Sequence, residues 1–203
     1  MLYAISAITL SYLLGCINTG YYLVRLQTGR DIRTLASGNS GSRNVGRLLG
    51  SRGFIVTLIG DAGKGAAAVW CVQRMGGGHL LATIALLAVT AGHIWPVQLG
   101  FRGGKGFATF WGGMIFLEPL VLLAGLALCA VVYPLVRGTT KAGMMALASS
   151  PIIMAIVRFR GNPLPAMPDF ALYCGLVGMV LFAHRANIRK EYCTRGSDAA
   201  PGA

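Results

Sequence analysis

The sequence predicts an all-α integral membrane protein with about seven transmembrane helices, an N-terminus outside and a C-terminus in the cytoplasm. Of the 203 residues, 55% are hydrophobic and only 12% are charged, whereas soluble domains average about 25% charged residues. The apolar residues gather in stretches of roughly 15 to 25 residues, close to the 20 or so that a membrane-spanning helix needs. A water-soluble chain of this length has no core large enough to bury so many apolar side chains.

The balance of charge supports the same fold class. There are 18 Lys+Arg residues against 6 Asp+Glu, a formal net charge of +12. In a soluble protein such an excess indicates nucleic-acid binding. Basic residues also collect on the cytoplasmic side of membrane proteins, where they contact anionic lipids. We therefore expect membrane lipids as partners, and no nucleic acid.

Seven apolar segments follow one another along the chain. The first lacks the basic region and the small-residue cleavage site of a signal peptide, so we interpret it as a span. A break is predicted at Glu118–Pro119, because a proline disfavours helix at the residue before it. The alternative is six helices, with 107–136 as one kinked element. The seven segments are 2–26, 53–73, 79–100, 107–117, 119–136, 142–157 and 169–184.

Loops on the two sides of the membrane divide the basic residues unevenly. With seven spans, 14 of the 18 basic residues fall in one set of loops, 3 in the other, and Lys64 lies within a segment. The positive-inside rule puts the richer set in the cytoplasm. This arrangement predicts a single transmembrane domain over 1–190 and a short, disordered cytoplasmic tail over 191–203.

The first cytoplasmic segment, Asp31–Arg47, has a composition that suits phosphate binding. It is longer than the usual loop between helices. Glycines let backbone N–H groups approach a ligand closely, and hydroxyls, amides and guanidiniums donate to oxyanions. A solvated basic loop on lipid headgroups is the alternative. Its polar and glycine residues include Ser37, Asn39, Ser40, Gly41, Ser42, Asn44 and Arg47.

A second cytoplasmic segment, Gly92–Thr109, has glycines on both sides of a lysine and resembles a phosphate-cradling loop. It is not a Walker A motif, because the spacing is one residue short and a glycine stands where Ser or Thr is required. ATP binding is therefore not implied. A flexible turn between helices is the alternative. The candidate residues are Arg102, Gly103, Gly104, Lys105 and Gly106.

Two further features carry polar groups. At the cytoplasmic end of the last segment, His184, Asn187 and Ile188 share a face if the helix continues, since they are spaced i, i+3 and i+4. A basic helix end at the interface is the alternative. Within the second segment, Asp61 and Lys64 are spaced i, i+3, which allows a salt bridge. Charges inside a span are costly, so this pair either stabilises the structure or lines a site.

Three cytoplasmic elements thus bring donors and positive charge with few acids, which predicts an anion site, with phosphate as the expected anion. No cluster of metal ligands and no CxxC pair is evident, so neither a metal nor another cofactor is expected. An anion transporter would be supported by a repeat across the two halves, and none is visible. A non-catalytic lipid-binding protein would explain the basic face, but not three separate motifs. An enzyme is the favoured interpretation.

These motifs, in this order, resemble the bacterial acyl-phosphate:glycerol-3-phosphate acyltransferase family (PlsY). The resemblance extends from Gly15 to about Lys190. Each motif alone is weak, and together they are highly specific. They read Ser37-Gly-Asn-x-Gly-x-x-Asn-Val-x-Arg47, Asp61-x-x-Lys-Gly65, Gly92-His-x-x-Pro96, Gly100-Phe-Arg-Gly-Gly-Lys-Gly-x-Ala-Thr109 and His184-Arg-x-Asn-Ile-x-Lys190.

The resemblance implies a multi-pass protein of the bacterial cytoplasmic (inner) membrane, with an active site that faces the cytoplasm. It implies transfer of a fatty acyl group from acyl phosphate to the sn-1 hydroxyl of glycerol 3-phosphate, which gives lysophosphatidic acid in phospholipid biosynthesis. No cofactor is implied. The soluble enzyme that supplies acyl phosphate is a further expected partner. Consistently, the His-x4-Asp motif of other glycerolipid acyltransferases is absent.

Matching positions assign the roles. The resemblance implies catalysis by Ser37, Arg47, Lys105, His184 and Asn187. It implies substrate binding by Asn39, Gly41, Asn44, Lys64, Arg102, Gly103, Gly104 and Gly106. The first motif also departs from the family: Ser40, Ser42 and Arg43 replace apolar and small residues, and Gly46 replaces a larger apolar one. These departures leave a different acceptor open.

Two mechanisms are open. In the first, the acceptor hydroxyl attacks directly, and His184 or a substrate phosphate oxygen takes its proton. In the second, Ser37 forms a covalent acyl intermediate. Direct attack is favoured, because nothing near Ser37 in the sequence resembles its base. Acyl phosphate is already activated, so a strong general base is less necessary.

Overall fold

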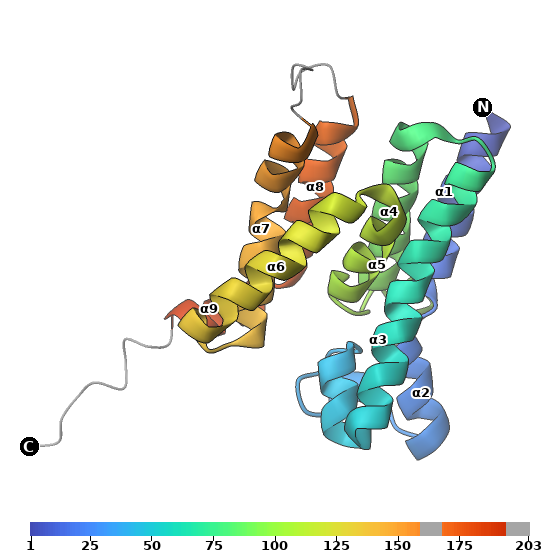
Figure 1. The fold of residues 1–203 in the computed structure, drawn as a ribbon. Coiled ribbons are helices and arrows are strands. Elements are labelled where there is room, and N and C mark those ends of the chain that lie inside the picture. The colour runs from blue at the N-terminus through green and yellow to red at the C-terminus, as the bar shows by residue number, and fades with distance from the viewer. Residues whose placement is uncertain (159–167, 194–203) are drawn as a thin grey trace, which may run out of the picture.

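The computed structural model describes residues 1–158 and 168–193, and every regular element in those ranges is a helix (Figure 1). Among these residues, five stretches are long and apolar enough to cross a membrane, and two shorter apolar helices accompany them. This agrees with the predicted all-α membrane protein. The α-helices are α1 (Leu2–Cys16), α2 (Thr19–Thr28), α3 (Ser42–Arg74), α4 (Gly78–Ile94), α5 (Phe107–Leu117), α6 (Pro119–Val136), α7 (Thr139–Arg158), α8 (Pro168–Ala183) and α9 (Arg185–Cys193). The 3-10 helices are η1 (Ile32–Thr34) and η2 (Val97–Leu99).

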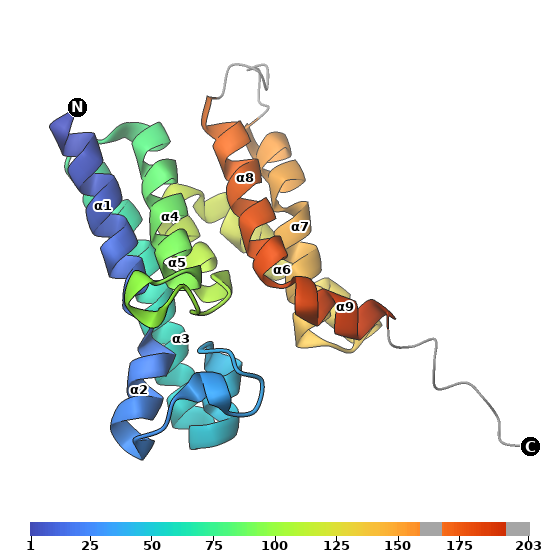
Figure 2. The ribbon, with the colours of Figure 1, turned by 180° about the vertical axis from the view of Figure 1, so that it is seen from behind.

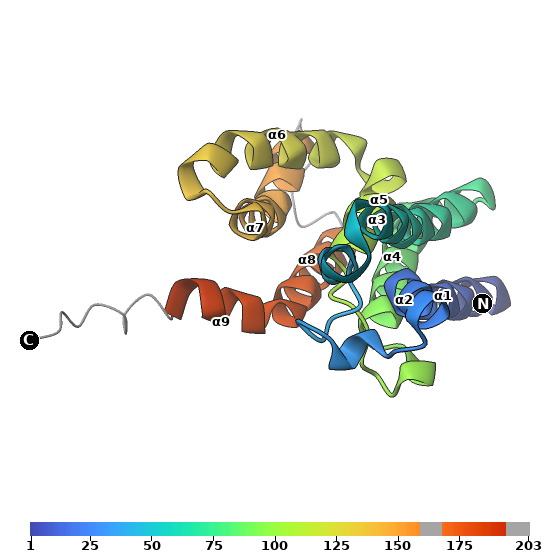
Figure 3. The same ribbon diagram turned by 90° about the horizontal axis from the view of Figure 1, so that it is seen from below.

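The helices form two groups that lie side by side (Figures 1 and 2). Helices α1, α3, α4 and α5 pack together in the first group, and α6, α7 and α8 form the second. The groups meet where α4 contacts α8 and α5 contacts α6. Seen along the bundle, α9 projects away from α8 and from the first group (Figure 3). The buried core between the groups includes Leu86, Val89, Phe110, Met114, Leu147, Tyr173 and Leu176.

The predicted first span, 2–26, is divided into α1 and α2 at Ile17–Asn18, where the backbone is extended. The break frees carbonyls that a continuous helix would use. The ammonium of Lys64 on α3 donates to the carbonyls of Gly15 (3.0 Å) and Ile17 (2.7 Å). The buried Asn18 side chain accepts from the hydroxyl of Ser40 (2.8 Å). The sequence did not predict the break, because its compensating partners come from α3 and from the following loop.

Helix α3 begins at Ser42 rather than at the predicted residue 53. Gly50 interrupts it with φ 72° and ψ −167°, so a short helical piece precedes the long span. A side chain would strain this backbone conformation, which glycine adopts freely. The segment predicted as a loop over Asp31–Arg47 is therefore helical from Ser42 onward, and Asn44 and Arg47 lie on a helix.

Small residues let α3 and α5 approach closely. A Cβ atom added at Gly65 of α3 would lie 2.0 Å from the carbonyl oxygen of Thr109 on α5. A Cβ atom at Gly112 of α5 would likewise lie 2.0 Å from the carbonyl oxygen of Ala62. Lipid tails are as apolar as the side chains of spanning helices, so the hydrophobic effect does not drive these helices together. Close van der Waals packing therefore supplies much of the free energy of their association.

The break between α5 and α6 lies where the proline predicts it. Helix α5 ends at Leu117, Glu118 is non-helical (φ −147°, ψ 72°), and α6 begins at Pro119. A proline in the first helical position loses no hydrogen bond, because that N–H has no partner within the helix. Helix α5 has 11 residues, too few to cross a bilayer alone. How many helices cross the membrane, and in which orientation, stays a prediction.

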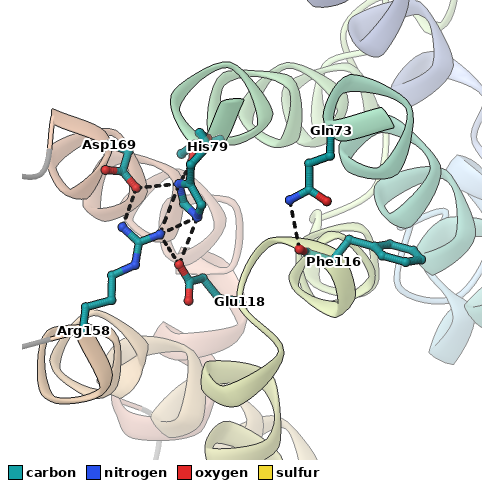
Figure 4. Close-up of polar contacts among 7 residues, drawn as sticks. Gln73, His79, Phe116, Glu118, Arg158 and Asp169 are labelled. Atoms are coloured by element: carbon teal, nitrogen blue, oxygen red, sulfur yellow. Dashed lines mark hydrogen bonds and ion pairs between the residues drawn. The ribbon is translucent and has the colours of Figure 1, made fainter. Parts of the chain in front are cut away.

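Near the end of the bundle that holds the N-terminus, four side chains join the two groups (Figure 4). His79 lies at the start of α4, Glu118 between α5 and α6, Arg158 at the end of α7 and Asp169 at the start of α8. The His79 ring lies 3.0 Å from Glu118 and 2.7 Å from Asp169. The Arg158 guanidinium lies 2.8 Å from Asp169 and also pairs with Glu118. We call these four residues the ion-pair network.

The two carboxylates of the ion-pair network are buried. Glu118 is 8% exposed and Asp169 is 6% exposed, so each carboxylate depends on its partners rather than on water. Beside the network, the Gln73 amide donates to the carbonyl of Phe116 (3.0 Å), which ties α3 to the end of α5 (Figure 4).

The C-terminal boundary differs from the prediction. Helix α9 continues to Cys193, so the predicted tail over 191–203 begins within a helix. Its remainder, 194–203, lies outside the described residues.

Candidate active site

A pocket of about 490 Å³ opens between the two helix groups. The starts of α3 and α7, which line it, lie at the end of the bundle away from the N-terminus (Figure 1). Residues from all three predicted cytoplasmic motifs line it. From the sequence prediction these are Ser37, Asn39, Gly41, Asn44, Arg47, Lys105, Gly106, His184 and Asn187. The lining residues that the prediction did not assign include Arg43, Phe54, Leu58, Asp61, His93, Phe107, Thr139, Thr140 and Met144.

The electrostatics of the pocket favour an anion. Helices α3, α5 and α7 begin at its wall, at Ser42, Phe107 and Thr139. Helix N-termini carry partial positive charge and N–H groups without helical partners, and therefore attract anions. Among the described lining residues Asp61 is the only acid, and it pairs with Lys64. The basic side chains at the wall are Arg43, Arg47 and Lys105.

Asn44 holds the loop that carries Ser37. Its side-chain oxygen accepts from the backbone N–H of Ser37 (3.2 Å), and its amide donates to the carbonyls of Leu35 (3.2 Å) and Asn39 (2.9 Å). Asn44 is buried. Its three hydrogen bonds therefore fix the loop that carries the exposed Ser37. The sequence predicted substrate binding for Asn44 and could not distinguish that role from this positioning role.

Arg33 anchors the same loop from the other side. Its guanidinium pairs with Asp31 (2.6 Å), donates to the carbonyl of Leu99 in η2 (2.6 Å) and lies over the ring of Tyr21. Hydrogen bonds from Arg33 hold the pKa of the Asp31 carboxyl below its usual value. The segments Asp31–Arg47 and Gly92–Thr109 are thereby joined through one arginine.

Lys105 and the third motif meet at the pocket. The Lys105 ammonium donates to the side-chain oxygen of Asn187 at 2.6 Å. Helix α8 ends at Ala183 and α9 begins at Arg185, so the helix does not continue through His184, and the condition for a shared helix face is not met. The turn at His184 nevertheless keeps both polar residues at the pocket, because the Asn187 N–H bonds to the His184 carbonyl (2.8 Å).

The buried His184 ring has a defined orientation. Its Nδ1 lies 2.8 Å from the carbonyl oxygen of Val180. A carbonyl only accepts, so Nδ1 carries the proton in this bond and Nε2 is left as the basic nitrogen. The ring packs edge-on against Phe107 at 6.1 Å between centroids. His184 thus has the tautomer that a general base requires.

Gly103 and Gly104 pack against α4 and do not line the pocket. Their backbone N–H groups bond to the carbonyls of Ile94 (3.1 Å) and His93 (3.0 Å). A Cβ atom at Gly104 would lie 2.0 Å from the His93 ring. These two glycines are therefore explained by close packing against His93. Arg102 is exposed and is also absent from the pocket wall.

A buried polar cluster lies at the inner wall of the pocket. Lys64 lies 3.1 Å from Asp61 and 2.7 Å from Nδ1 of His93. The salt bridge that the i, i+3 spacing allowed is therefore present. Asp61 and His93 line the pocket, whereas Lys64 lies behind them and caps the broken end of α1. Lys64 was predicted to bind substrate, and its position instead suits structural support. His93 was not predicted as a site residue, although the motif Gly92-His-x-x-Pro96 could have indicated it.

The family model described as glycerol-3-phosphate acyltransferase matches residues 5–193. The chain belongs to this family. A glycerol-3-phosphate acyltransferase of Desulfitobacterium hafniense is 40% identical over 180 residues, which cover 89% of this chain and 86% of that protein. One from Rubrobacter xylanophilus is also 40% identical, over 183 residues that cover 90% of this chain and 88% of that protein.

Two solved structures resemble the fold closely. The glycerol 3-phosphate form of PlsY (YgiH), an integral membrane glycerol 3-phosphate acyltransferase, superposes with a TM-score of 0.83 at 28% identity, covering 95% of this chain and 94% of that one. Its lysophosphatidic acid form has a TM-score of 0.80 at 26% identity. The acyltransferase family and the multi-pass membrane fold expected from the sequence are thus both confirmed.

Proposed function

We propose that this chain transfers a fatty acyl group from acyl phosphate to the sn-1 hydroxyl of glycerol 3-phosphate, and releases lysophosphatidic acid and phosphate. Membership of the glycerol-3-phosphate acyltransferase family supports the acceptor and the reaction class. One observation carries the proposal for the site. Ser37, Arg47, Lys105 and His184 come from three separate motifs and line one pocket.

The positive pocket suits two phosphorylated substrates. Both acyl phosphate and glycerol 3-phosphate are anions, so they repel one another when they bind side by side. Arg47, Lys105 and the N-termini of α3, α5 and α7 screen that repulsion and orient the two reacting groups. Asp61 adds little opposing charge, because Lys64 neutralises it.

The His184 geometry supports direct attack. The acceptor oxygen forms a bond to the acyl carbon, the bond from that carbon to the phosphate oxygen breaks, and the phosphate leaves with the electron pair. The hydroxyl proton passes to Nε2 of His184 or to a phosphate oxygen. A Val180 carbonyl that accepts from Nδ1 keeps Nε2 available for this step.

The surroundings of Ser37 also favour direct attack over an acyl-serine intermediate. A nucleophilic serine needs an adjacent base within hydrogen-bond reach. Within residues 1–158 and 168–189, no side-chain base bonds to the Ser37 hydroxyl, and Asn44 contacts its backbone N–H instead. We therefore assign Ser37 to substrate binding through its hydroxyl.

An apolar part of the pocket wall suits the acyl chain. Phe54 and Leu58 on α3, Phe107 on α5 and Met144 on α7 line it beside the polar groups. The pocket lies between two helix groups, so an acyl chain that passes between them would remain in the bilayer while its phosphate sits among the cations.

We further propose that the chain lies in the bacterial cytoplasmic membrane, with seven crossings and the pocket at the cytoplasmic face. The uneven distribution of basic residues supports this orientation. A soluble enzyme that delivers acyl phosphate is the expected partner at that face. Labelling of single cysteines placed at Met75 or Ser51, in a chain whose five native cysteines are replaced, with a membrane-impermeant reagent on intact cells would test it: only the first should react.

Acyl transfer by the purified protein in lipidic mesophase tests the reaction. Palmitoyl phosphate with glycerol 3-phosphate should give lysophosphatidic acid, palmitoyl-CoA should give none, and Ser37→Ala should lose the activity. Product with palmitoyl-CoA alone would contradict the assigned donor. No product with either donor, from protein that unfolds cooperatively, would contradict the assigned acceptor. Mass analysis of the protein after acyl phosphate alone would reveal an acyl-serine if one forms.

A further inference from the structure

We propose that Arg43 is a specificity-determining residue of this pocket, whose guanidinium leaves Thr140 and binds a substrate phosphate. The proposal rests on the function proposed above and adds one phosphate ligand that neither the motifs nor the comparisons assign. Either substrate carries the phosphate that this guanidinium would bind, and the experiment separates the two.

Arg43 is placed to reach a bound substrate. It lies in the first turn of α3 and lines the pocket, as does Arg47 one turn further along the same helix face. A phosphate at the N-terminus of α3 would therefore meet two guanidiniums from one helix. Thr139 and Thr140, at the start of α7, line the facing wall.

The observed partner of Arg43 is weak for a guanidinium. One of its nitrogens donates to the hydroxyl of Thr140, which joins α3 in the first helix group to α7 in the second. A guanidinium carries five N–H donors in a fork that matches the oxygens of a phosphate. Hydrogen bonds between charged partners are roughly twice as strong as those to neutral groups. A phosphate would therefore displace the threonine hydroxyl.

Two other arginines pair with carboxylates, and Arg43 has no such partner among the described side chains. Arg33 pairs with Asp31, and Arg158 pairs with Glu118 and Asp169. Within the described side chains no carboxylate lies within ion-pair distance of Arg43, and the one acid of the pocket wall, Asp61, is bound by Lys64. Among the described residues, therefore, no carboxylate compensates the Arg43 charge, which remains available to an incoming anion.

The hydrogen bond from Arg43 to Thr140 also links the two helix groups, so its loss would affect more than the charge of the pocket. It spans the two helix groups at the pocket, so a phosphate that takes Arg43 releases α7 from α3. Removal of the Thr140 hydroxyl should favour the released state, whereas removal of the guanidinium should remove a phosphate ligand. The two changes therefore have opposite effects on phosphate binding.

The test compares three variants with wild type. Arg43→Met removes the charge at similar length, Arg43→Lys keeps the charge without the fork, and Thr140→Val removes only the hydroxyl. Arg52→Met is the matched control, because Arg52 is exposed on the same helix and absent from the pocket wall. Calorimetry of glycerol 3-phosphate binding comes first. Kinetics follow, with each substrate varied while the other is saturating.

We expect Arg43→Met to weaken one phosphate substrate by about 10-fold or more, as its Kd or KM, because hydrogen bonds to charged groups contribute strongly. Arg43→Lys should recover part of the loss, Thr140→Val should bind as tightly as wild type or tighter, and Arg52→Met should match wild type. If only the Kd or KM for glycerol 3-phosphate rises, Arg43 binds the phosphate of the acceptor. If only the KM for palmitoyl phosphate rises, Arg43 binds the phosphate of the donor.

Equal losses in Arg43→Met and Thr140→Val would overturn the proposal, because the bridge would then be structural only. Unchanged Kd and KM values in Arg43→Met would overturn it as well. If that variant does not fold, the comparison of Arg43→Lys with Thr140→Val decides in the same way. A wild-type protein that binds glycerol 3-phosphate and makes no product contradicts the proposed function, while the binding arm still decides the role of Arg43.

Discussion

The pocket and the ion-pair network both join the two helix groups, and they handle charge in opposite ways. In the network, Arg158 and His79 meet two buried carboxylates, Glu118 and Asp169, and every member is paired (Figure 4). In the pocket, Arg43, Arg47 and Lys105 line an open space in which Asp61 is the one acid among the described side chains, and Asp61 is bound to Lys64.

This difference separates stability from binding. A closed set of opposite charges stabilises the contact between the helix groups, because each buried charge would be costly alone. An open set of like charges does not help folding and provides affinity for an incoming anion. We therefore expect changes in the network to alter stability and changes in the pocket to alter activity, as five predictions test.

The largest expected effect follows Arg158→Leu. It leaves Glu118 and Asp169 buried with only His79, so we expect the free energy of unfolding to fall by about 3–5 kcal/mol. Thermal unfolding in detergent should show a lower midpoint, while specific activity per folded protein is kept. Arg74→Leu, at the exposed end of α3, is the control. Equal losses in both variants would show that the network does not stabilise the fold.

Lys105→Met should lower activity and leave stability nearly unchanged, the opposite of Arg158→Leu. Loss of one preorganised cation typically lowers the rate by about 10²–10³-fold, and Lys105 also holds Asn187. We expect kcat/KM to fall by that factor while the unfolding midpoint stays near that of wild type. Arg74→Met serves as the charge-matched control. A large fall in the midpoint would place Lys105 with the structural residues instead.

Asn44→Ala should affect both properties, because Asn44 belongs to the pocket and is fully hydrogen-bonded. Its loss removes hydrogen bonds to the Ser37 N–H and to the Leu35 and Asn39 carbonyls, which we expect to lower stability by about 1–3 kcal/mol. Activity should fall as the Ser37 loop loosens. Ser37→Ala, measured in parallel, should lose activity without any change in stability. Full activity in Asn44→Ala would mean that the loop is held by other contacts.

Salt should distinguish the two regions more finely. Raising NaCl from 0.05 to 0.5 M shortens the Debye length and screens the open pocket, so we expect KM for glycerol 3-phosphate to rise by roughly threefold. The buried network is poorly screened, and the difference in unfolding midpoint between wild type and Arg158→Leu should hold across the same range. A salt-independent KM would argue against a site built on exposed cations.

The smallest effect is expected at the Asp31–Arg33 pair. Arg33 lowers the pKa of Asp31, so this pair stabilises the fold above the unfolded-state pKa and loses that contribution as the pH falls through the folded-state pKa. The pair is partly exposed, and its contribution is therefore about 0.5 kcal/mol. Asp31→Asn should be slightly less stable at pH 7 and equal to wild type near pH 2. A difference that grows in acid would reverse the assigned sign.

Local patterns predicted much of the fold. Pro119 marked the boundary between α5 and α6, because the restriction that proline imposes is local. The start of α3 at Ser42 and the break at Ile17–Asn18 were missed, because both depend on distant partners. Lys64 donates to the carbonyls of Gly15 and Ile17 at that break. The residues around Asn18 in the sequence do not predict this contact.

Most predicted site residues do meet in one pocket, and the exceptions have a common cause. Gly103 and Gly104 were predicted to bind phosphate through their N–H groups, and those groups bond to α4 instead. Arg43 and Thr140 are separated by 97 positions in the sequence, so motif spacing could not predict their contact.

The sequence by itself determined the class of the protein. Hydrophobic runs need a bilayer, and glycine-rich basic motifs suit phosphate; both are properties of composition and order along the chain. Tertiary structure decided which cations are free to bind. Pairing depends on which carboxylate lies within a few ångströms: among the described residues, Arg158 pairs with Glu118 and Asp169, Arg33 pairs with Asp31, and Arg43 faces a hydroxyl across the pocket.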